Sequence, residues 1–517
     1  MGNHTTKTKK MKQLLAFLVI VITLAACSSK PEYPQKSDRT PTIVPDYTDV
    51  TIPAGIAPLN FYVDEDGVDR VDVIVKGAKG GELHTNGDFA DFDIDEWHAL
   101  LKQNLGDNLS VTVCARINGE WTEYKPFTIH VSNDSLGEWG VTYRLIPPGY
   151  ETYGSMGLYQ RDLSTFDETP IVENKNVGGN CLNCHTTNRT NPSHWTFHVR
   201  GEHGATAVGY DGQIDILTPR NEELGGGMVY PYWHPSGKFI AYSTNQTHQN
   251  FYQLNNRRVE VYDDKSDIII YQLGSGFEMS EQPHVILFDS IVATTQQLEN
   301  YPAFSPDGQW LYFCSAQRVD SIWKHYRDVK YNICRVSFDP ETGVLGRNIE
   351  TIVDARSIGK SANMPRLSYD GQYLLYTLSD YGCFPIWHSE ADLWMMNVAT
   401  GETWPLDNAN SDDAESFHNW SLNSRWILFT SRRDDGLYTQ LYIAHIDEQG
   451  KASKPFRLPQ QNPKEYDAET IYSFNTPDFA SEPIDLQKAD IHQRLTSKER
   501  ISTTLKRVLE EKLWKPK

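Results

Sequence analysis

The chain has 517 residues, a formal net charge of −20 and 12% aromatic residues. Its length exceeds what one hydrophobic core usually serves, so two or three folded units are expected. The acidic charge disfavours contact with phosphate backbones and anionic lipid headgroups, which excludes nucleic acid as a partner. With 35 Gly, 27 Pro and few long apolar helical stretches, the chain is predicted to be mainly β.

Residues 1–26 have the composition of an export signal. A positive stretch precedes an apolar run, residues 14–24, that is short for a permanent membrane span. Leu24-Ala25-Ala26-Cys27 at its end resembles the lipobox of bacterial lipoproteins. That resemblance implies that Cys27 is lipidated, which would anchor the protein in the cell envelope, at the outer membrane, facing the periplasm or the outside. An ordinary signal peptide and an uncleaved anchor helix are the alternatives.

A tether and a small domain are predicted next. Residues 27–49 are rich in Pro, Ser, Lys and Asp, as flexible linkers are. Residues 50–145 contain short apolar runs that alternate with polar residues, such as 71–75 and 110–113, separated by Gly, Asp and Asn. This pattern predicts a small β-sandwich domain with one helix near residues 95–105.

The segment 146–204 contains a motif that specifies chemistry, Cys181-Leu182-Asn183-Cys184-His185. C-x-x-C-H is the attachment sequence of c-type haem, because two thiols at this spacing add to the two vinyl groups and the next residue places its imidazole under the iron. Export agrees with this chemistry, since c-type haem is attached outside the cytoplasmic membrane. We predict one covalent haem c, held by Cys181, Cys184 and His185, with Arg200 as the partner of a propionate.

Other roles of the cysteine pair stay open at this stage. They are a zinc site completed by His194 or His198, a redox dithiol and a structural disulfide. For a haem, the second axial ligand decides between electron transfer and the binding of small molecules. His198, in an aromatic stretch thirteen positions beyond His185, is the predicted second ligand, and Met228 is the alternative.

Residues 205–480 repeat a phrase of a strand, a tight turn and a strand. One copy reads Tyr301-Pro302-Ala303-Phe304-Ser305-Pro306-Asp307-Gly308, and others start at Tyr230, Met364 and His418. Pro and Asp-Gly supply the turn, and the flanking apolar residues would pack between blades. The phrase resembles the repeats of TolB-like (PD40 or WD40-like) propellers and of prolyl oligopeptidase relatives. That resemblance implies a β-propeller, with six blades favoured and five or seven as alternatives.

Residues 481–517 are predicted to end in a helix that packs against the propeller. Two residues suited to an N-cap, Thr496 and Ser497, precede apolar residues at helical spacing. These apolar residues are Ile501, Leu505, Val508 and Leu509.

Taken together, these features resemble a group of exported proteins of Bacteroidetes-type bacteria that join one C-x-x-C-H motif to TolB-like repeats. The resemblance implies an architecture but no settled activity. We expect a monohaem electron-transfer lipoprotein whose propeller docks a redox partner or another envelope protein. A non-catalytic propeller scaffold and a haem peroxidase or small-molecule sensor are the alternatives. The chain has no G-x-S-x-G nucleophile elbow, and no catalytic residue is predicted.

Overall fold

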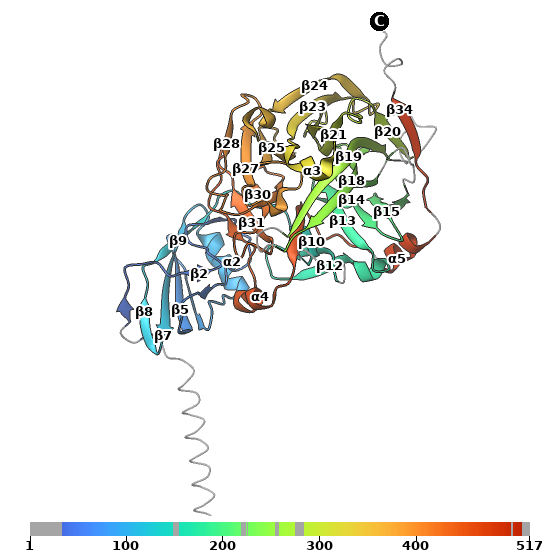
Figure 1. The fold of residues 1–517 in the computed structure, drawn as a ribbon. Coiled ribbons are helices and arrows are strands. Elements are labelled where there is room, and N and C mark those ends of the chain that lie inside the picture. The colour runs from blue at the N-terminus through green and yellow to red at the C-terminus, as the bar shows by residue number, and fades with distance from the viewer. Residues whose placement is uncertain are drawn as a thin grey trace, which may run out of the picture.

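The computed structural model describes residues 34–147, 155–218, 226–253, 258–273, 284–486, 488–497 and 500–508, together with 31 and 224. The predicted signal segment and Cys27 lie outside these residues. An N-terminal domain, up to about residue 131, lies beside a ring of sheets formed by the rest of the chain (Figure 1).

The N-terminal domain is built from two sheets and one helix. The helix α2 (Ile94–Gln103) confirms the helix predicted near residues 95–105, and the Asp93 side chain caps it by accepting hydrogen bonds from the backbone N–H groups of Asp95 and Glu96. Its buried face, with Trp97 and Leu101, packs on the larger sheet. The larger, seven-stranded sheet contains β1 (Gln35–Lys36), β3 (Thr51–Ile52), β5 (Val68–Gly77), β6 (Glu82–Gly87), β7 (Asn108–Ile117), β8 (Glu120–Glu123) and β9 (Phe127–Val131), and the smaller contains β2 (Ile43–Val44) and β4 (Tyr62–Val63).

The described part of the rest of the chain forms six sheets of four or five strands, which are the blades of a β-propeller. Blade 1 contains β10 (Gly140–Ile146), β11 (Gly157–Asp162), β12 (Glu168–Glu173) and β33 (Ser473–Ala480). Blade 2 contains β13 (Cys181–Asn188), β14 (Asn191–Arg200), β15 (Ala205–Tyr210) and β16 (Gln213–Leu217). Blade 3 contains β17 (Gly227–Trp233), β18 (Phe239–Phe251), β19 (Val259–Gln272), β20 (Val285–Asp289) and β34 (Thr504–Val508).

The remaining three blades follow the same pattern of antiparallel neighbours in chain order. Blade 4 contains β21 (Gln297–Phe304), β22 (Trp310–Gln317), β23 (Asn332–Phe338) and β24 (Leu345–Val353). Blade 5 contains β25 (Ser361–Leu367), β26 (Tyr373–Ser379), β27 (Asp392–Asn397) and β28 (Thr403–Pro405). Blade 6 contains β29 (Glu415–Trp420), β30 (Trp426–Ser431), β31 (Gln440–His445) and β32 (Phe456–Arg457).

The ring is closed by a strand from near the C-terminus. In blade 1, β33 pairs with β10, so that the innermost strand comes from the end of the chain and the outer three from its first third. Neighbouring innermost strands contact each other from β13 through β17, β21, β25, β29 and β33, and β33 contacts β13. This continuous ring confirms the six-bladed propeller, and its closure leaves no sheet edge exposed at the centre.

The propeller begins earlier than the sequence predicted. It starts at Gly140 rather than at residue 205, and the segment 146–204, predicted as a separate haem-attachment unit, supplies strands of blades 1 and 2. The C-x-x-C-H motif thus lies on β13, the innermost strand of blade 2. The predicted turns of the repeat are confirmed at Gly237, Gly308 and Gly371, which have φ of 73°, 71° and 74°.

The end of the chain differs from the predicted helix. A helix does occur, α5 (Lys488–Thr496), but Thr504–Val508 forms β34, which pairs with β20 in parallel, and Ile501 bridges to Leu217. The outer edge of a blade offers unpaired backbone groups, and pairing with them outweighs the helical spacing of the apolar residues. Leu509 lies outside the described residues.

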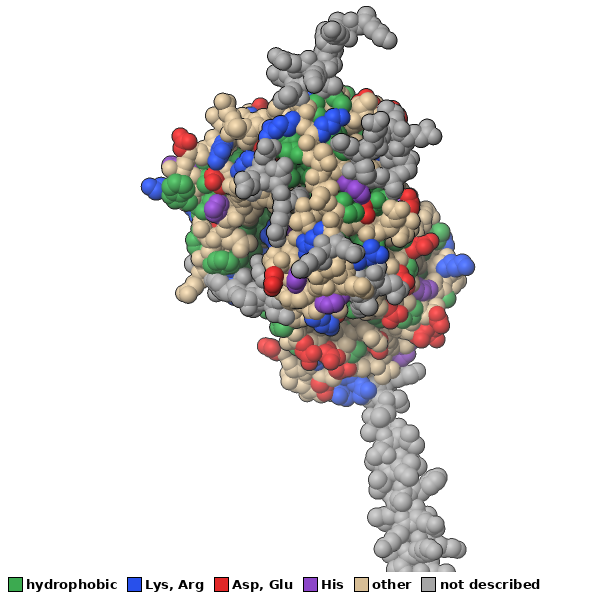
Figure 2. Space-filling model, turned by 90° about the vertical axis from the view of Figure 1, so that its right-hand side faces the viewer, with side chains coloured by type: hydrophobic (Ala, Val, Ile, Leu, Met, Phe, Trp, Pro, Cys, Tyr) green, Lys and Arg blue, Asp and Glu red, His purple; other side chains and the backbone are tan. Residues whose placement is uncertain are grey.

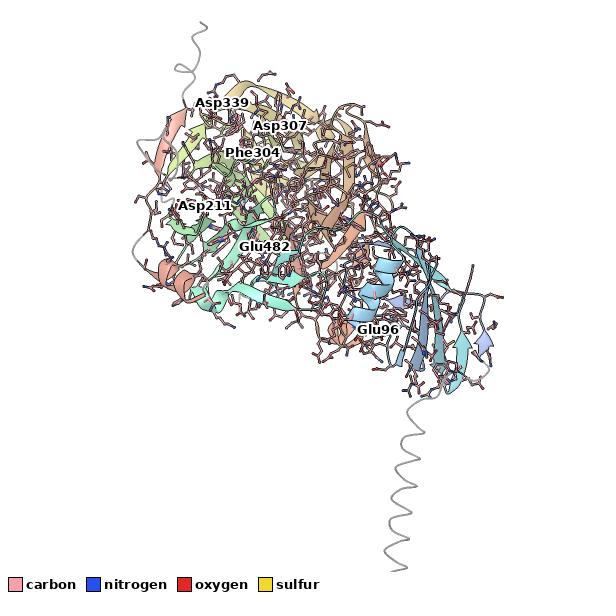
Figure 3. The ribbon with its side chains drawn as sticks, turned by 180° about the vertical axis from the view of Figure 1, so that it is seen from behind. Glu96, Asp211, Phe304, Asp307, Asp339 and Glu482 are labelled. Atoms are coloured by element: carbon pink, nitrogen blue, oxygen red, sulfur yellow. The ribbon has the colours of Figure 1, made fainter. Side chains whose placement is uncertain are left out.

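The two domains share one hydrophobic core. It extends from Trp97 and Phe127 in the N-terminal domain to Trp426 of blade 6 and Phe479 of β33. Figure 3 shows Glu96 of α2 on one side of the molecule and Asp307 and Asp339 of blade 4 at the opposite end. Acidic side chains gather on the lower end of the face in Figure 2, in agreement with the negative net charge.

Candidate functional site: the propeller channel

Each innermost strand contains one β-bulge. In β13, for example, Asn183 pairs with His198 and Thr186 pairs with Thr196. Between these two pairs β13 has two residues and β14 has one, so β13 contains one extra residue. The bulged residue has a positive φ of 45–57° in all six strands, an unusual conformation for residues other than glycine that costs of the order of 1 kcal/mol or more each. The six residues are Cys184, Tyr230, Tyr301, Met364, Phe417 and Thr476.

The bulge explains how the two thiols of the motif meet. Residues three apart on an unbroken strand point to opposite faces, but one extra residue restores the same face. Cys181 and Cys184 accordingly line the same cavity, here called the thiol pocket. Its volume is about 100 Å³, and its other lining residues are Arg144, Ile146, Asn183, Arg200, Tyr230, Thr247, Gln249, Val261, Phe384, Phe417 and Thr476.

The thiols are buried, reduced and close to positive charge. Cys181 and Cys184 are 5% and 7% exposed, and neither forms a disulfide. Burial raises the pKa of the Cys184 thiol, and the nearby guanidinium of Arg200 opposes that rise only in part. A thiol held in its protonated form is a weak nucleophile, which argues against a rapid dithiol exchange site.

His185 lies in an adjoining cavity, here called the channel cavity, whose lining residues come from the innermost strands of all six blades and include Met364 and His418. Its Nε2 lies 3.2 Å from the hydroxyl of Thr142, and its Nδ1 lies 3.5 Å from the hydroxyl of Thr476. Burial, and to a smaller extent the charge of Arg144, lower the pKa of His185 to about 4, so the imidazole is neutral at pH 7.

The two predicted second ligands lie elsewhere. His198 is on β14, where its Nδ1 lies 3.0 Å from the Thr206 hydroxyl, and it lines neither cavity. Its Nε2 faces Gly227, where an added Cβ would come within 2.6 Å of it. Met228 is fully buried in the apolar core between blades 2 and 3. The structure therefore does not bring either residue to His185.

The sequence predicted no role as haem ligands for the residues that do share a cavity with His185. Met364 comes from the bulge of blade 5, which reads Asn-Met-Pro, and His418 follows the bulge of blade 6, which reads Ser-Phe-His. Both triplets resemble Asn183-Cys184-His185 of blade 2. Recognising Asn183-Cys184-His185 as one more copy of the propeller repeat would have placed the motif on an innermost strand. His418 donates from Nε2 to the backbone carbonyl oxygens of Met364 and Leu375, at 2.7 Å and 3.2 Å, so its imidazole is already engaged. The thioether of Met364 is therefore the better candidate for a second ligand in this cavity.

A haem and a zinc ion make different demands on the residues around the motif. Within the described residues, no three His, Cys, Asp or Glu side chains are grouped as ligands of one metal ion, which gives no support to a zinc site at the motif. A c-type haem needs only one imidazole from the motif, two thiols on one side of a pocket and cationic partners for its carboxylates. The thiol pocket and His185 provide these groups, so the chemistry of the residues fits a haem.

The acid sensitivity of the haem-free fold should depend on His185. Because its pKa is about 4 in the folded protein and near 6.5 when unfolded, the unfolded state binds the extra proton as pH falls between these values. Its contribution to stability is intact above pH 6.5 and falls by up to about 1.4 kcal/mol per pH unit toward pH 4. Urea unfolding of wild type and His185→Gln from pH 7 to 4.5 should give a shallower loss in the variant, and parallel profiles would contradict the expectation.

Comparison with known proteins identifies no family for the chain. No protein-family model and no curated protein matches the chain. Solved structures with similarity include prolyl oligopeptidase B from Galerina marginata, at 12% identity over 78% of this chain and 54% of that one, with a TM-score of 0.34. The GH74 enzyme of Niastella koreensis has 12% identity over 67% of this chain and 46% of that one (TM-score 0.34). The Cps50 (Swd1) β-propeller domain of Myceliophteria thermophila has 11% identity over 66% of this chain and 93% of that one (TM-score 0.31).

The chain spans about half the length of the prolyl oligopeptidase that it matches. At these TM-scores the assignment as a six-bladed propeller depends on the strand pairing and ring closure described above, and not on the likeness.

Proposed function

We propose that the protein is an electron carrier of the cell envelope that binds one haem covalently at the thiol pocket. The proposal depends on one observation: Cys181 and Cys184 line a single pocket with two guanidinium groups, those of Arg144 and Arg200, beside the imidazole of His185. Guanidinium groups match the geometry of carboxylates, and two of them would face two propionates.

Each residue of the site would have its own task. The two cysteines would fix the group to β13, and His185, already neutral, would offer Nε2 to the iron after giving up its contact with Thr142. When bound, a haem supplies one-electron transfer at its iron. Met364, in the same cavity as His185, replaces His198 and Met228 as our proposed second ligand.

The small volume of the thiol pocket favours a second candidate function. Pockets that enclose ligands of drug size usually measure about 300–1,000 Å³, against about 100 Å³ here.

Strands β10 and β33 provide Arg144 and Thr476 to the wall of the thiol pocket, so we propose that haem attachment precedes the closure of blade 1. A chain that receives no haem would be a propeller scaffold for envelope proteins, and the small cavity supports that alternative.

Attachment to the outer membrane through Cys27 and docking of a redox partner complete the proposal. Among the described residues, no helix is both long and apolar enough to span a bilayer. An acidic surface suits a partner with a basic docking face and would make their association faster at low ionic strength.

Mass spectrometry of the protein isolated from a host that matures c-type cytochromes tests the proposal. We expect the mature chain to have gained the mass of one haem, and Cys181→Ala/Cys184→Ala to have gained none. Cys114→Ala, a change at another buried and free thiol, is the matched control and should keep the haem. A wild-type chain without added porphyrin mass would overturn the haem proposal in favour of the scaffold.

A further inference from the structure

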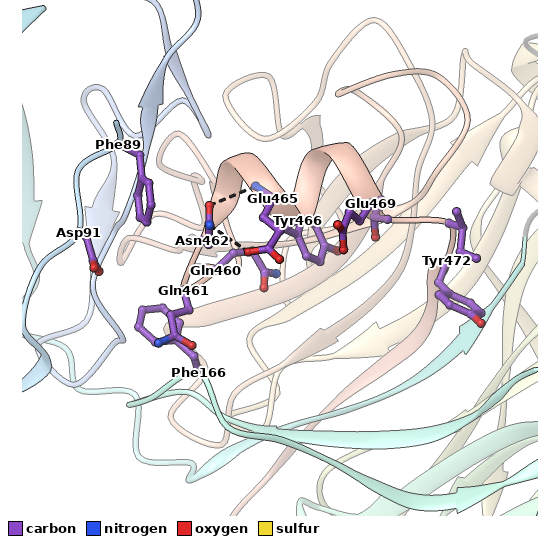
Figure 4. Close-up of a pocket in the computed structure, with 12 residues that line it drawn as sticks. Phe89, Asp91, Phe166, Gln460, Gln461, Asn462, Glu465, Tyr466, Glu469 and Tyr472 are labelled. Carbon is purple, nitrogen blue, oxygen red and sulfur yellow. Dashed lines mark hydrogen bonds between the residues drawn. The ribbon is translucent and has the colours of Figure 1, made fainter. Parts of the chain in front are cut away.

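A cavity of about 680 Å³ lies between the N-terminal domain and the propeller, with no residue in common with the thiol pocket or the channel cavity. Its size falls within the range of pockets for small molecules. Phe89 and Asp91 of the N-terminal domain form one side, and the helix α4 (Pro463–Glu469) forms the other (Figure 4). Phe166, from the loop between β11 and β12, closes it from below in this view.

The lining combines aromatic rings with carboxylates. Phe89, Phe166, Tyr466 and Tyr472 supply the rings. The carboxylates are those of Asp91, Glu465 and Glu469, and no Lys, Arg or His is among the residues that the structure describes as lining the cavity. Aromatic faces attract cations, and carboxylates pair with them, whereas an anion would meet no compensating charge here.

Two basic side chains, Arg457 and Arg161, lie behind the cavity, and the Arg457 guanidinium is 5.8 Å from the centroid of the Tyr466 ring. Arg457 contacts the carboxylates of Asp434 and Asp467, at 3.5 Å and 2.9 Å. Arg161 donates to the side-chain oxygen of Gln460 at 3.0 Å. The two carboxylates compensate Arg457, and Arg161 lies behind Gln460, so the described lining itself contributes three carboxylates and no basic group.

The carboxylates are spread along the cavity and not gathered at a point. Glu465 and Glu469 are one helical turn apart, which places their Cβ atoms about 5–6 Å from each other. Asp91 lies across the cavity from the helix (Figure 4), and burial raises its pKa. Within the described residues no three His, Cys, Asp or Glu side chains are grouped to hold one metal ion, whereas an extended ligand with several positive charges would reach carboxylates on both sides of the cavity.

We propose that this cavity binds an aliphatic polyamine, whose ammonium groups pair with the carboxylates of α4 and Asp91 while its methylene chain lies on the aromatic rings. The methylene chain would exclude water from the ring faces, and that exclusion strengthens both the ion pairs and the cation–π contacts. This site is independent of the haem proposal and of the state of Cys181 and Cys184.

Calorimetric titration of the full-length protein with spermidine at low salt tests the site. We expect saturable binding of one spermidine per chain. Glu469→Gln should weaken it about three- to fivefold, Asp91→Asn/Glu469→Gln about tenfold, and Phe166→Leu about threefold. Glu469 lies in the last turn of α4, where loss of a negative charge favours the helix, so Glu469→Gln should stay folded.

The matched control is Glu341→Gln, which removes an exposed carboxylate from the turn between β23 and β24, next to Asp339 at the far end of the propeller (Figure 3). It should bind spermidine as wild type does. Equal weakening by Glu341→Gln and Glu469→Gln would mean that spermidine binds the acidic surface in general, and would overturn the proposal. Equally tight binding of Mg²⁺ or of the uncharged octane-1,8-diol would overturn it too, because neither combines positive charge with an apolar body.

Discussion

Replacement of Phe479 by alanine is expected to lower the free energy of unfolding by about 3–5 kcal/mol, the cost usual for removing a fully buried phenylalanine side chain. Phe479 is 0% exposed on β33, opposite Val141 of β10, and belongs to the core shared by both domains. The change would therefore weaken the pairing that closes the ring. Urea unfolding, with the slope of the transition compared as well as its midpoint, measures this effect.

Phe251→Ala is the matched control, because Phe251 is 54% exposed at the end of β18. Its change in unfolding free energy should stay within about 0.5 kcal/mol. Similar losses in the two variants would show that β33 does not hold the ring closed.

Four of the six blades could be recognised in the sequence, three of them because their turns use distinctive residues. Asp307-Gly308 and Asp370-Gly371 adopt the positive φ that such turns need, at the glycine. Blade 2 turns at Arg189 and Thr190, which have φ of 51° and 64° without any glycine, and so it resembles the repeat only in three dimensions. Local residue preferences cannot show a turn that the surrounding sheet imposes.

Blade 1 was hidden for a different reason. Its two inner strands, β10 and β33, pair Gly140 with Ala480. A pattern within one stretch of sequence cannot indicate that two residues so far apart in the chain are paired. The prediction of a helix at the C-terminus was wrong for a similar reason: Leu505 pairs with Ile286 of β20, a residue far from it in the sequence. Burial and pairing at long range override local periodicity in both places.

Only the motif part of the candidate site could be predicted from the sequence, and the second ligand could not. The spacing of Cys181, Cys184 and His185 identified the groups that would bind a haem, because those three residues are neighbours in the chain. His198 was chosen for its nearness in sequence, but β14 is the second strand of the blade, and its residue lies between sheets rather than on the axis. Met364 reaches the axis because it occupies the equivalent bulge of blade 5.

Substitution of Met364 by leucine is expected to open one coordination position of the iron in the haem-loaded protein. Met364 and Met228 are both buried, 2% and 0% exposed, but only Met364 lines the cavity of His185. Leucine has a similar volume and lacks the sulfur, so each substitution should cost less than about 1.5 kcal/mol and leave the propeller folded.

The reduced Met364→Leu protein should bind carbon monoxide, as seen by a shift of its haem absorption band, whereas reduced wild type and Met228→Leu should not. Loss of the thioether should also lower the reduction potential, because a methionine ligand raises it relative to other axial ligands. If Met228→Leu binds carbon monoxide and Met364→Leu does not, the second ligand lies between blades 2 and 3. If wild type itself binds carbon monoxide, the iron has an open position, and the chain is a sensor or peroxidase in place of an electron carrier.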